Sequence, residues 1–188
     1  MIEFTVLKTK VKISPLFFAI LTAFLAADKS GIAFSAIAFS AIHEATHFAA
    51  LFIFGGAPAE VKISVFGINM RLFGIMNTWK RIAVFFVGAA ANLLLAVFFT
   101  MQENRIYCAV NLAIGIFSLL PLPSTDGGSI IMELAECLFP ESCKKMCRSV
   151  FLVSGIITAT VIFAIMILSR NWYLAAALFY TVISLLKY

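Results

Sequence analysis

The stretch His43–Glu44–Ala45–Thr46–His47 lies inside a long apolar run and contains the only two histidines of the chain. Residues four apart lie on one face of a helix, so both imidazoles project from the same side, with the Glu44 carboxylate beside them. Two imidazoles at this spacing with an adjacent glutamate are typical of zinc hydrolases. The helix that carries this motif therefore decides which fold and which chemistry to expect.

The composition indicates a membrane protein. Of the 188 residues, 63% are hydrophobic and only 12% are charged, about half of the ~25% that is usual in soluble domains. We expect a single integral membrane domain over 1–188, with a catalytic core at about 31–135. The net charge of +5 is scattered and forms no basic–aromatic patch, so no nucleic-acid partner is expected. The first apolar run has no convincing cleavage site, which predicts a retained helix.

Six apolar segments are candidates for spans of the ~30 Å hydrocarbon core. They are 13–27, 31–54, 82–100, 106–120, 150–168 and 172–186. Trp172 and Tyr173 stand where interfacial aromatic anchors are common. The predicted fold is an all-α polytopic membrane protein with about six transmembrane helices.

The distribution of lysine and arginine predicts the orientation. With the N-terminus in the cytoplasm, the outer turns hold only Lys29, Arg105 and Arg170, and the other 11 of the 14 basic residues lie inside. This bias predicts that both termini are cytoplasmic and that the active site lies toward the cytoplasmic side.

The segment 60–72, between the second and third spans, alternates polar and apolar residues until Gly67 interrupts the pattern. Such alternation favours a small β-hairpin or sheet at the membrane surface, and an ordinary loop is the alternative. An exposed strand edge there could accept an extended segment of another chain.

After the fourth span, two prolines and a glycine pair in 121–128 exclude a continuous helix. Irregular backbone at membrane depth occurs only where it is buried in protein or lines a wet cavity. A short amphipathic helix is expected over 129–139, with Glu133 and Glu136 on its polar side.

A catalytic zinc needs a third protein ligand. Asp126 is the strongest candidate, because it ends an apolar span on the proline- and glycine-shaped turn and intramembrane acids are usually functional. Asp28 and Glu103 lie at outer turns, at the wrong end for this topology. Glu44 is expected to act as the general base rather than as a ligand.

The four cysteines, Cys108, Cys137, Cys143 and Cys147, leave a second metal site as an alternative. Their spacing differs from that of CxxC zinc sites, and no histidine remains to complete one. Reduced cytoplasmic thiols are the favoured interpretation.

Three motifs together resemble those of the site-2 protease family (peptidase family M50) of intramembrane zinc metalloproteases. They are the histidine motif, Leu-Pro-Leu-Pro-Ser-Thr-Asp-Gly-Gly at 120–128, and Val-Gly-Ala-Ala-Ala-Asn at 87–92, which is similar to the family's Gly-Pro-x-x-Asn segment. The six-span plan looks most like the stage IV sporulation protein FB group. The resemblance implies zinc held by His43, His47 and Asp126, with Glu44 as the catalytic base. It also implies regulated intramembrane proteolysis of membrane-associated precursors of regulators, such as a pro-sigma factor.

The chain departs from the family pattern at positions associated with substrate engagement. Ser118 stands where the family usually has an asparagine eight residues before the ligand aspartate, and Ser124 replaces a usual proline. Asn92, Ser118 and Ser124 are the candidate substrate-binding residues, although Asn92 could equally hold helices together. No counterpart of the group's nucleotide-binding CBS domain is found, so nucleotide regulation is not expected.

The predicted function is therefore cleavage of a peptide bond within or near the membrane segment of a membrane-associated regulatory protein. The expected cofactor is Zn²⁺. The expected partners are that substrate, the lipid bilayer and, as a candidate, an inhibitory membrane protein. The expected location is a bacterial or archaeal cell membrane. The alternatives are a catalytically divergent or non-enzymatic membrane binding protein and a metal-ion transporter.

Overall fold

The computed structural model describes residues 2–6, 9–64, 67–73, 76–170 and 174–186. The chain divides into two compact units, Met1–Phe117 and Ser118–Tyr188. The first unit contains a β-sheet and four helices, the last of which ends just beyond the boundary, and the second contains three helices. The assignment of 1–188 to one domain stays a prediction.

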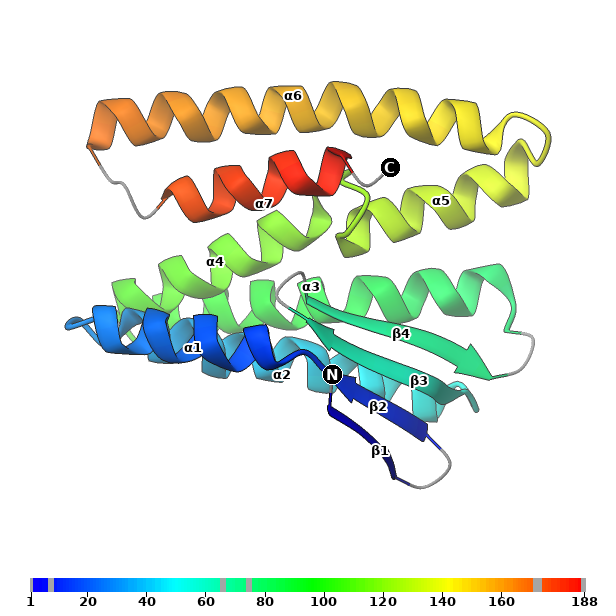
Figure 1. Ribbon diagram of the computed structural model, residues 1–188, viewed down its shortest axis with the longest axis horizontal. Coiled ribbons are helices and arrows are strands. Elements are labelled where there is room, and N and C mark those ends of the chain that lie inside the picture. The colour runs from blue at the N-terminus through cyan, green and yellow to red at the C-terminus, as the bar shows by residue number, and fades with distance from the viewer. Residues whose placement is uncertain (1, 7–8, 65–66, 74–75, 171–173, 187–188) are drawn as a thin grey trace. The chain divides into compact units, whose positions relative to one another are not determined.

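The helices of the first unit are α1 (Pro15–Ala27), α2 (Ile32–Ile53), α3 (Thr78–Met101) and α4 (Arg105–Leu119). α2 and α3 pack against each other (Figure 1). Their contact includes a cluster of buried side chains, Ala50, Leu51, Met76 and Val84. The helix that carries the histidine motif is therefore held along one side by α3.

The sheet has the strand order β1 (Ile2–Val6), β2 (Thr9–Ile13), β3 (Ala57–Ser64) and β4 (Gly67–Phe73) (Figure 1). The antiparallel pairing of β3 with β4 confirms the predicted hairpin. β2 pairs parallel with β3, so α1 and α2 form the crossover between them. The sheet is thus larger than the predicted hairpin, and it begins within the first few residues.

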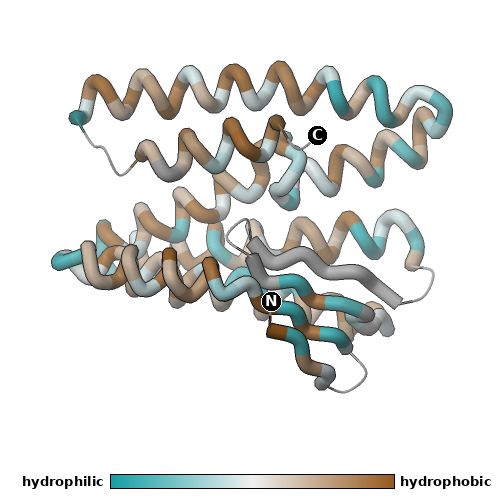
Figure 2. The backbone as a smooth tube through the Cα atoms, in the orientation of Figure 1, coloured by the Kyte–Doolittle hydropathy of each residue, from teal (hydrophilic) through white to brown (hydrophobic). Residues whose placement is uncertain are grey.

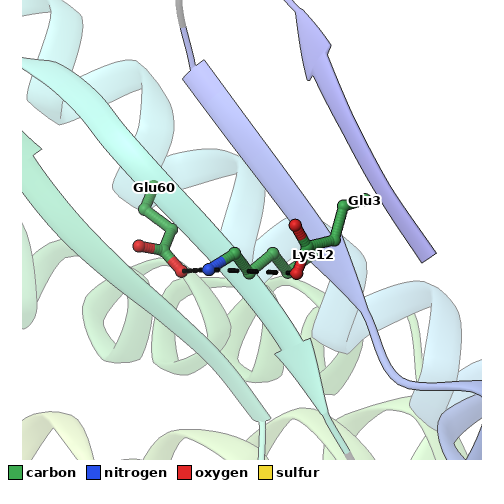
Figure 3. A network of polar contacts seen from close by, with 3 residues as sticks. All are labelled: Glu3, Lys12 and Glu60. Atoms are coloured by element: carbon green, nitrogen blue, oxygen red, sulfur yellow. Dashed lines mark ion pairs between the residues drawn. The ribbon is translucent and has the colours of Figure 1, made fainter. Parts of the chain in front are cut away.

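Ion pairs link the three strands β1, β2 and β3 (Figure 3). The Lys12 ammonium lies 2.9 Å from a Glu60 carboxylate oxygen and 4.0 Å from one of Glu3. These partly exposed contacts contribute about 1 kcal/mol or less each. Lys12, counted above only as a topology signal, therefore also helps to align the strands.

Asp28 begins the connection from α1 to α2 and acts as a cap for α2. Its Oδ2 accepts a hydrogen bond from the Ala33 amide at 2.6 Å, and Oδ1 accepts from the Ser30 hydroxyl and amide. The Ser30 hydroxyl bond, followed by the backbone bonds, lowers the pKa of this carboxyl. Asp28 thus has a structural role at the start of the motif helix.

The second unit contains α5 (Asp126–Leu138), α6 (Cys143–Ser169) and α7 (Leu174–Leu186). α6 packs against both α5 and α7. Its buried cluster is formed by Ala135, Cys143, Cys147 and Phe151. All four cysteines are free thiols, with 4.0 Å between the sulfurs of Cys143 and Cys147.

Three helices among the described residues are long and apolar enough to cross a membrane, namely α2, α3 and α6. Figure 2 shows α6 hydrophobic over most of its length and hydrophilic near its first turns. α1, α4 and α7 are apolar but have 13, 15 and 13 residues, fewer than the ~20 of a typical span. The chain is accordingly treated as an integral membrane protein, and its six crossings stay a prediction. Trp172 and Tyr173 lie outside the described residues.

Candidate metal centre

His43 and His47 lie one turn apart on α2, and both are buried. Their ring centroids are 4.7 Å apart, with the ring planes nearly perpendicular. Their Nε2 atoms approach to 3.0 Å. The predicted placement of both imidazoles on one helix face is confirmed.

A backbone carbonyl determines which nitrogen of His47 carries the proton. Nδ1 lies 2.6 Å from the carbonyl oxygen of Val84 on α3. A carbonyl can only accept, so Nδ1–H of His47 donates and Nε2 of the neutral ring keeps its lone pair.

The side chain of Asn92 has the same effect on His43. Its Oδ1 lies 2.9 Å from His43 Nδ1, while its Nδ2 faces the Asn111 Oδ1 and, at a longer 3.5 Å, the Phe39 carbonyl. Because the amide nitrogen of Asn92 must donate toward the Phe39 carbonyl, its oxygen faces the ring. His43 therefore also donates through Nδ1 and leaves a lone pair on Nε2.

This geometry fits two ligands of one metal ion. Two Nε2 lone pairs that face one another at 3.0 Å repel each other unless a proton or a cation lies between them. Two nitrogens at ~2.0–2.1 Å from a tetrahedral zinc are ~3.3 Å apart, close to the observed spacing. Imidazoles with Nδ1–H bound to an oxygen acceptor are also the usual arrangement of zinc ligands.

Gly88 on α3 creates the space for both rings. A Cβ at this position would collide with Nε2 and Cε1 of His47 and with Cε1 of His43. The absence of a side chain at Gly88 is therefore what lets both rings fit against α3.

We expect Gly88→Ala to weaken zinc binding more than it weakens the fold. Alanine favours a helix over glycine by about 0.5–1 kcal/mol, but the added methyl group displaces the two rings. The predicted result is zinc affinity at least ~10-fold lower with only a small change in unfolding temperature, because the helix propensity of alanine offsets part of the overpacking; chelator competition and thermal unfolding measure the two effects.

Gly115→Ala on α4 is the matched control, because the added Cβ would meet the Leu93 side chain and the Ala89 carbonyl rather than a histidine. Equal zinc affinities of the two variants would contradict the role assigned to Gly88.

Glu44 follows His43 on α2 and is half-buried. Its place next to His43 in the histidine motif makes its carboxylate the candidate general base. Its neighbour Thr46 donates to the His43 carbonyl at 2.7 Å, which adds a contact within the same helical turn.

Asp126 is the first residue of α5, in the second unit. The Thr125 side chain caps this helix by accepting from the Gly128 amide at 3.2 Å. A Cβ on Gly127 would collide with the Leu119 carbonyl, and one on Gly128 with the Leu122 carbonyl. The predicted broken turn is confirmed, and its glycine pair lets the chain fold back closely on itself before Asp126.

Three further contacts hold this turn within the second unit. The Ser124 hydroxyl receives a hydrogen bond from Tyr180 at 2.9 Å and lies 2.7 Å from the hydroxyl of Ser184, both on α7. Ser154 on α6 donates to the Pro121 carbonyl. Contacts with α7 thus hold Ser124 in place. Ser118 lies in the last turn of α4.

Two contributors to the histidine site were not predicted from the sequence, namely Asn111 and the Val84 carbonyl. Asn111 is a buried amide in the apolar segment 106–120, so its polarity was a readable signal. The Val84 carbonyl had no sequence signal, because it is backbone. The proposed substrate contacts of Asn92, Ser118 and Ser124 stay predictions, although Asn92 is now seen to bond His43.

No protein-family model and no curated protein sequence matches this chain. Among solved structures, the chain is similar to the site-2 protease from Methanocaldococcus jannaschii, with a TM-score of 0.67 and 14% sequence identity. The alignment covers 99% of this chain and 94% of that chain. The likeness shows that the chain has the fold of a site-2 protease, while its activity is a separate question.

Proposed function

We propose that this protein is an intramembrane zinc metalloprotease in which His43, His47 and Asp126 hold the metal. The observation that carries the proposal is the pair of buried imidazoles whose Nδ1 atoms are both committed to oxygen acceptors. Three protein ligands and one open position are the usual composition of a catalytic zinc site. The site-2 protease fold and the apolar helices support a reaction at the membrane.

Zinc, when bound, supplies a Lewis acid that polarises a peptide carbonyl and acidifies a nearby water molecule. Glu44 then accepts the proton as that water attacks the carbonyl carbon. The same carboxyl returns the proton to the amide nitrogen as the peptide bond breaks. His43 and His47 keep their protons on Nδ1 throughout, because Asn92 and the Val84 carbonyl accept them.

The sheet offers a way to present the substrate. β1 and β4 are its outer strands, and a helix must unwind before its peptide bonds become accessible. An extended segment that adds to an outer strand would satisfy its own backbone hydrogen bonds while it exposes a bond to attack.

The proposal also includes the substrate, the membrane and the orientation of the chain. The substrate is a membrane-associated regulatory protein, cut within or near its membrane segment. The protein resides in a bacterial or archaeal cell membrane with both termini and the active site toward the cytoplasm. The excess of lysine and arginine on the inner loops supports this orientation.

The experiment is cleavage of single-span reporter proteins by the full chain in lipid vesicles, with the products identified by mass spectrometry. We expect a cut within or near the reporter's membrane segment, and loss of cleavage when a chelator removes zinc. Added zinc, but not magnesium, should restore the rate, because imidazole ligands prefer zinc. Cleavage that survives complete metal removal would contradict the proposal.

A further inference from the structure

Two asparagines with no exposed surface, Asn92 on α3 and Asn111 on α4, form a hydrogen-bonded relay that ends on His43. Asn92 Nδ2 donates to Asn111 Oδ1 at 3.0 Å, and Asn111 Nδ2 donates to the Tyr107 carbonyl at 2.9 Å. The relay lies entirely in the first unit and joins α2, α3 and α4.

The relay has one consistent direction. The Tyr107 carbonyl can only accept a hydrogen bond, so the amide nitrogen of Asn111 must point toward it. Oδ1 of Asn111 therefore points toward Asn92. That oxygen accepts a hydrogen bond from the amide nitrogen of Asn92. The side-chain oxygen of Asn92 then faces His43. Each amide orientation thus follows from the one before it, and the last one requires a proton on His43 Nδ1.

The fixed end of the relay is itself well anchored. The Tyr107 ring packs edge-on against Phe39 of α2 and Phe99 of α3, with centroid distances of 5.5 and 5.2 Å. The Phe39 carbonyl also accepts from Asn92. Movement of the relay would therefore disturb an aromatic cluster that spans three helices.

The two histidines are positioned in different ways. His47 bonds a backbone carbonyl, which the helix α3 already holds in place. His43 bonds the side chain of Asn92, which can rotate. The orientation of the His43 ring therefore depends on what holds the Asn92 side chain. Asn111 supplies the missing restraint.

We propose that Asn92 and Asn111 are positioning residues that fix the tautomer and ring plane of His43 and thereby set the affinity for zinc. The inference rests on the proposed function. This role differs from the two alternatives for Asn92, substrate binding and helix–helix adhesion, because the acceptor atom of Asn92 faces a proposed metal ligand. Changes to partners of this kind usually alter metal affinity by about 10–100-fold.

The test compares the zinc affinity of the full chain and its variants in vesicles by chelator competition. Asn92→Leu keeps a similar volume without an acceptor and should bind zinc ~10–100-fold more weakly. Asn92→Asp keeps an acceptor for Nδ1–H but turns its second oxygen toward the Asn111 oxygen and the Phe39 carbonyl, so it should recover only part of that loss. Asn111→Leu should weaken binding in the same direction by less, because Asn92 keeps its bond to the Phe39 carbonyl.

Thr100→Val on α3 is the control, since the Thr100 hydroxyl bonds the Ala96 carbonyl and the Cys108 thiol of α4 rather than a member of the relay. It should bind zinc like the wild type. At saturating zinc, the KM of Asn92→Leu for a reporter substrate should equal that of the wild type, whereas a substrate-binding role would raise it.

Each outcome decides a different question. A folded Asn92→Leu variant that binds zinc as tightly as the wild type would overturn the relay and leave the protease proposal intact. If Asn92→Leu does not fold, unchanged zinc affinity in Asn111→Leu would overturn the relay in the same way. A wild-type protein that takes up no zinc would overturn the protease proposal together with the relay.

Discussion

Glu44→Gln is expected to lower the rate of peptide-bond cleavage by about 10²–10⁴-fold, the usual contribution of a positioned general base. The amide has almost the same shape as the carboxylate but cannot accept the proton of the attacking water. Zinc content should stay at the wild-type level, because the proposed ligands are unchanged. The measurement is the single-turnover rate on a reporter protein, together with metal analysis of the same sample.

Glu136→Gln provides the control for this experiment. Glu136 is exposed on α5, so the same chemical change there should leave the rate unaltered. A Glu44→Gln protein that cuts at the wild-type rate would remove Glu44 from the mechanism, even if the metal site proved correct.

Asp126→Ala is expected to reduce cleavage to background. The change leaves two of the three proposed protein ligands, and a catalytic zinc normally has three. The fold should persist, because Thr125 still caps α5 and the glycine pair still shapes the turn. The loss of an acid from the first helical turn costs only about 0.3–1 kcal/mol. Cleavage rate and thermal unfolding, measured side by side, separate these two effects, and a variant that still cleaves at the wild-type rate would exclude Asp126 as a ligand.

The features that could be predicted from the sequence are those encoded over short distances. The histidine spacing on α2 predicts a shared helix face, and the structure places both rings together. The prolines and glycines at 121–128 predict a broken backbone, and Gly127 and Gly128 do lie against carbonyls that exclude any larger residue. The alternation in 60–72 predicts the β3–β4 hairpin.

The features that were missed depend on contacts between distant residues. β1 and β2 carry the alternating pattern of strands, but the lysines of β2 enter the sequence-based prediction only as topology signals. The parallel pairing of β2 with β3 joins residues separated by two helices, for example Val11 and Val61, and no local pattern reports it. Asn111 reaches Asn92 only because α3 and α4 pack together.

The chemistry of the site is likewise predicted from the sequence only in part. The residue types predict a metal site, whereas the direction of each hydrogen bond, and hence the tautomer of each ring, follows only from the acceptors that α3 provides. Gly88 illustrates the point: its place in the segment 87–92 does not reveal its neighbours, and the structure shows that they are the two rings.

The most direct test of the central claim is the zinc content of the purified full chain and of two variants, Asp126→Ala and Glu136→Ala. The second variant removes an exposed acid from the same helix as Asp126. We predict one zinc ion per chain in the wild type and in Glu136→Ala, and little or none in Asp126→Ala after dialysis against a weak chelator. An Asp126→Ala protein that retains zinc as fully as the wild type would contradict the claim that Asp126 completes the metal site with His43 and His47.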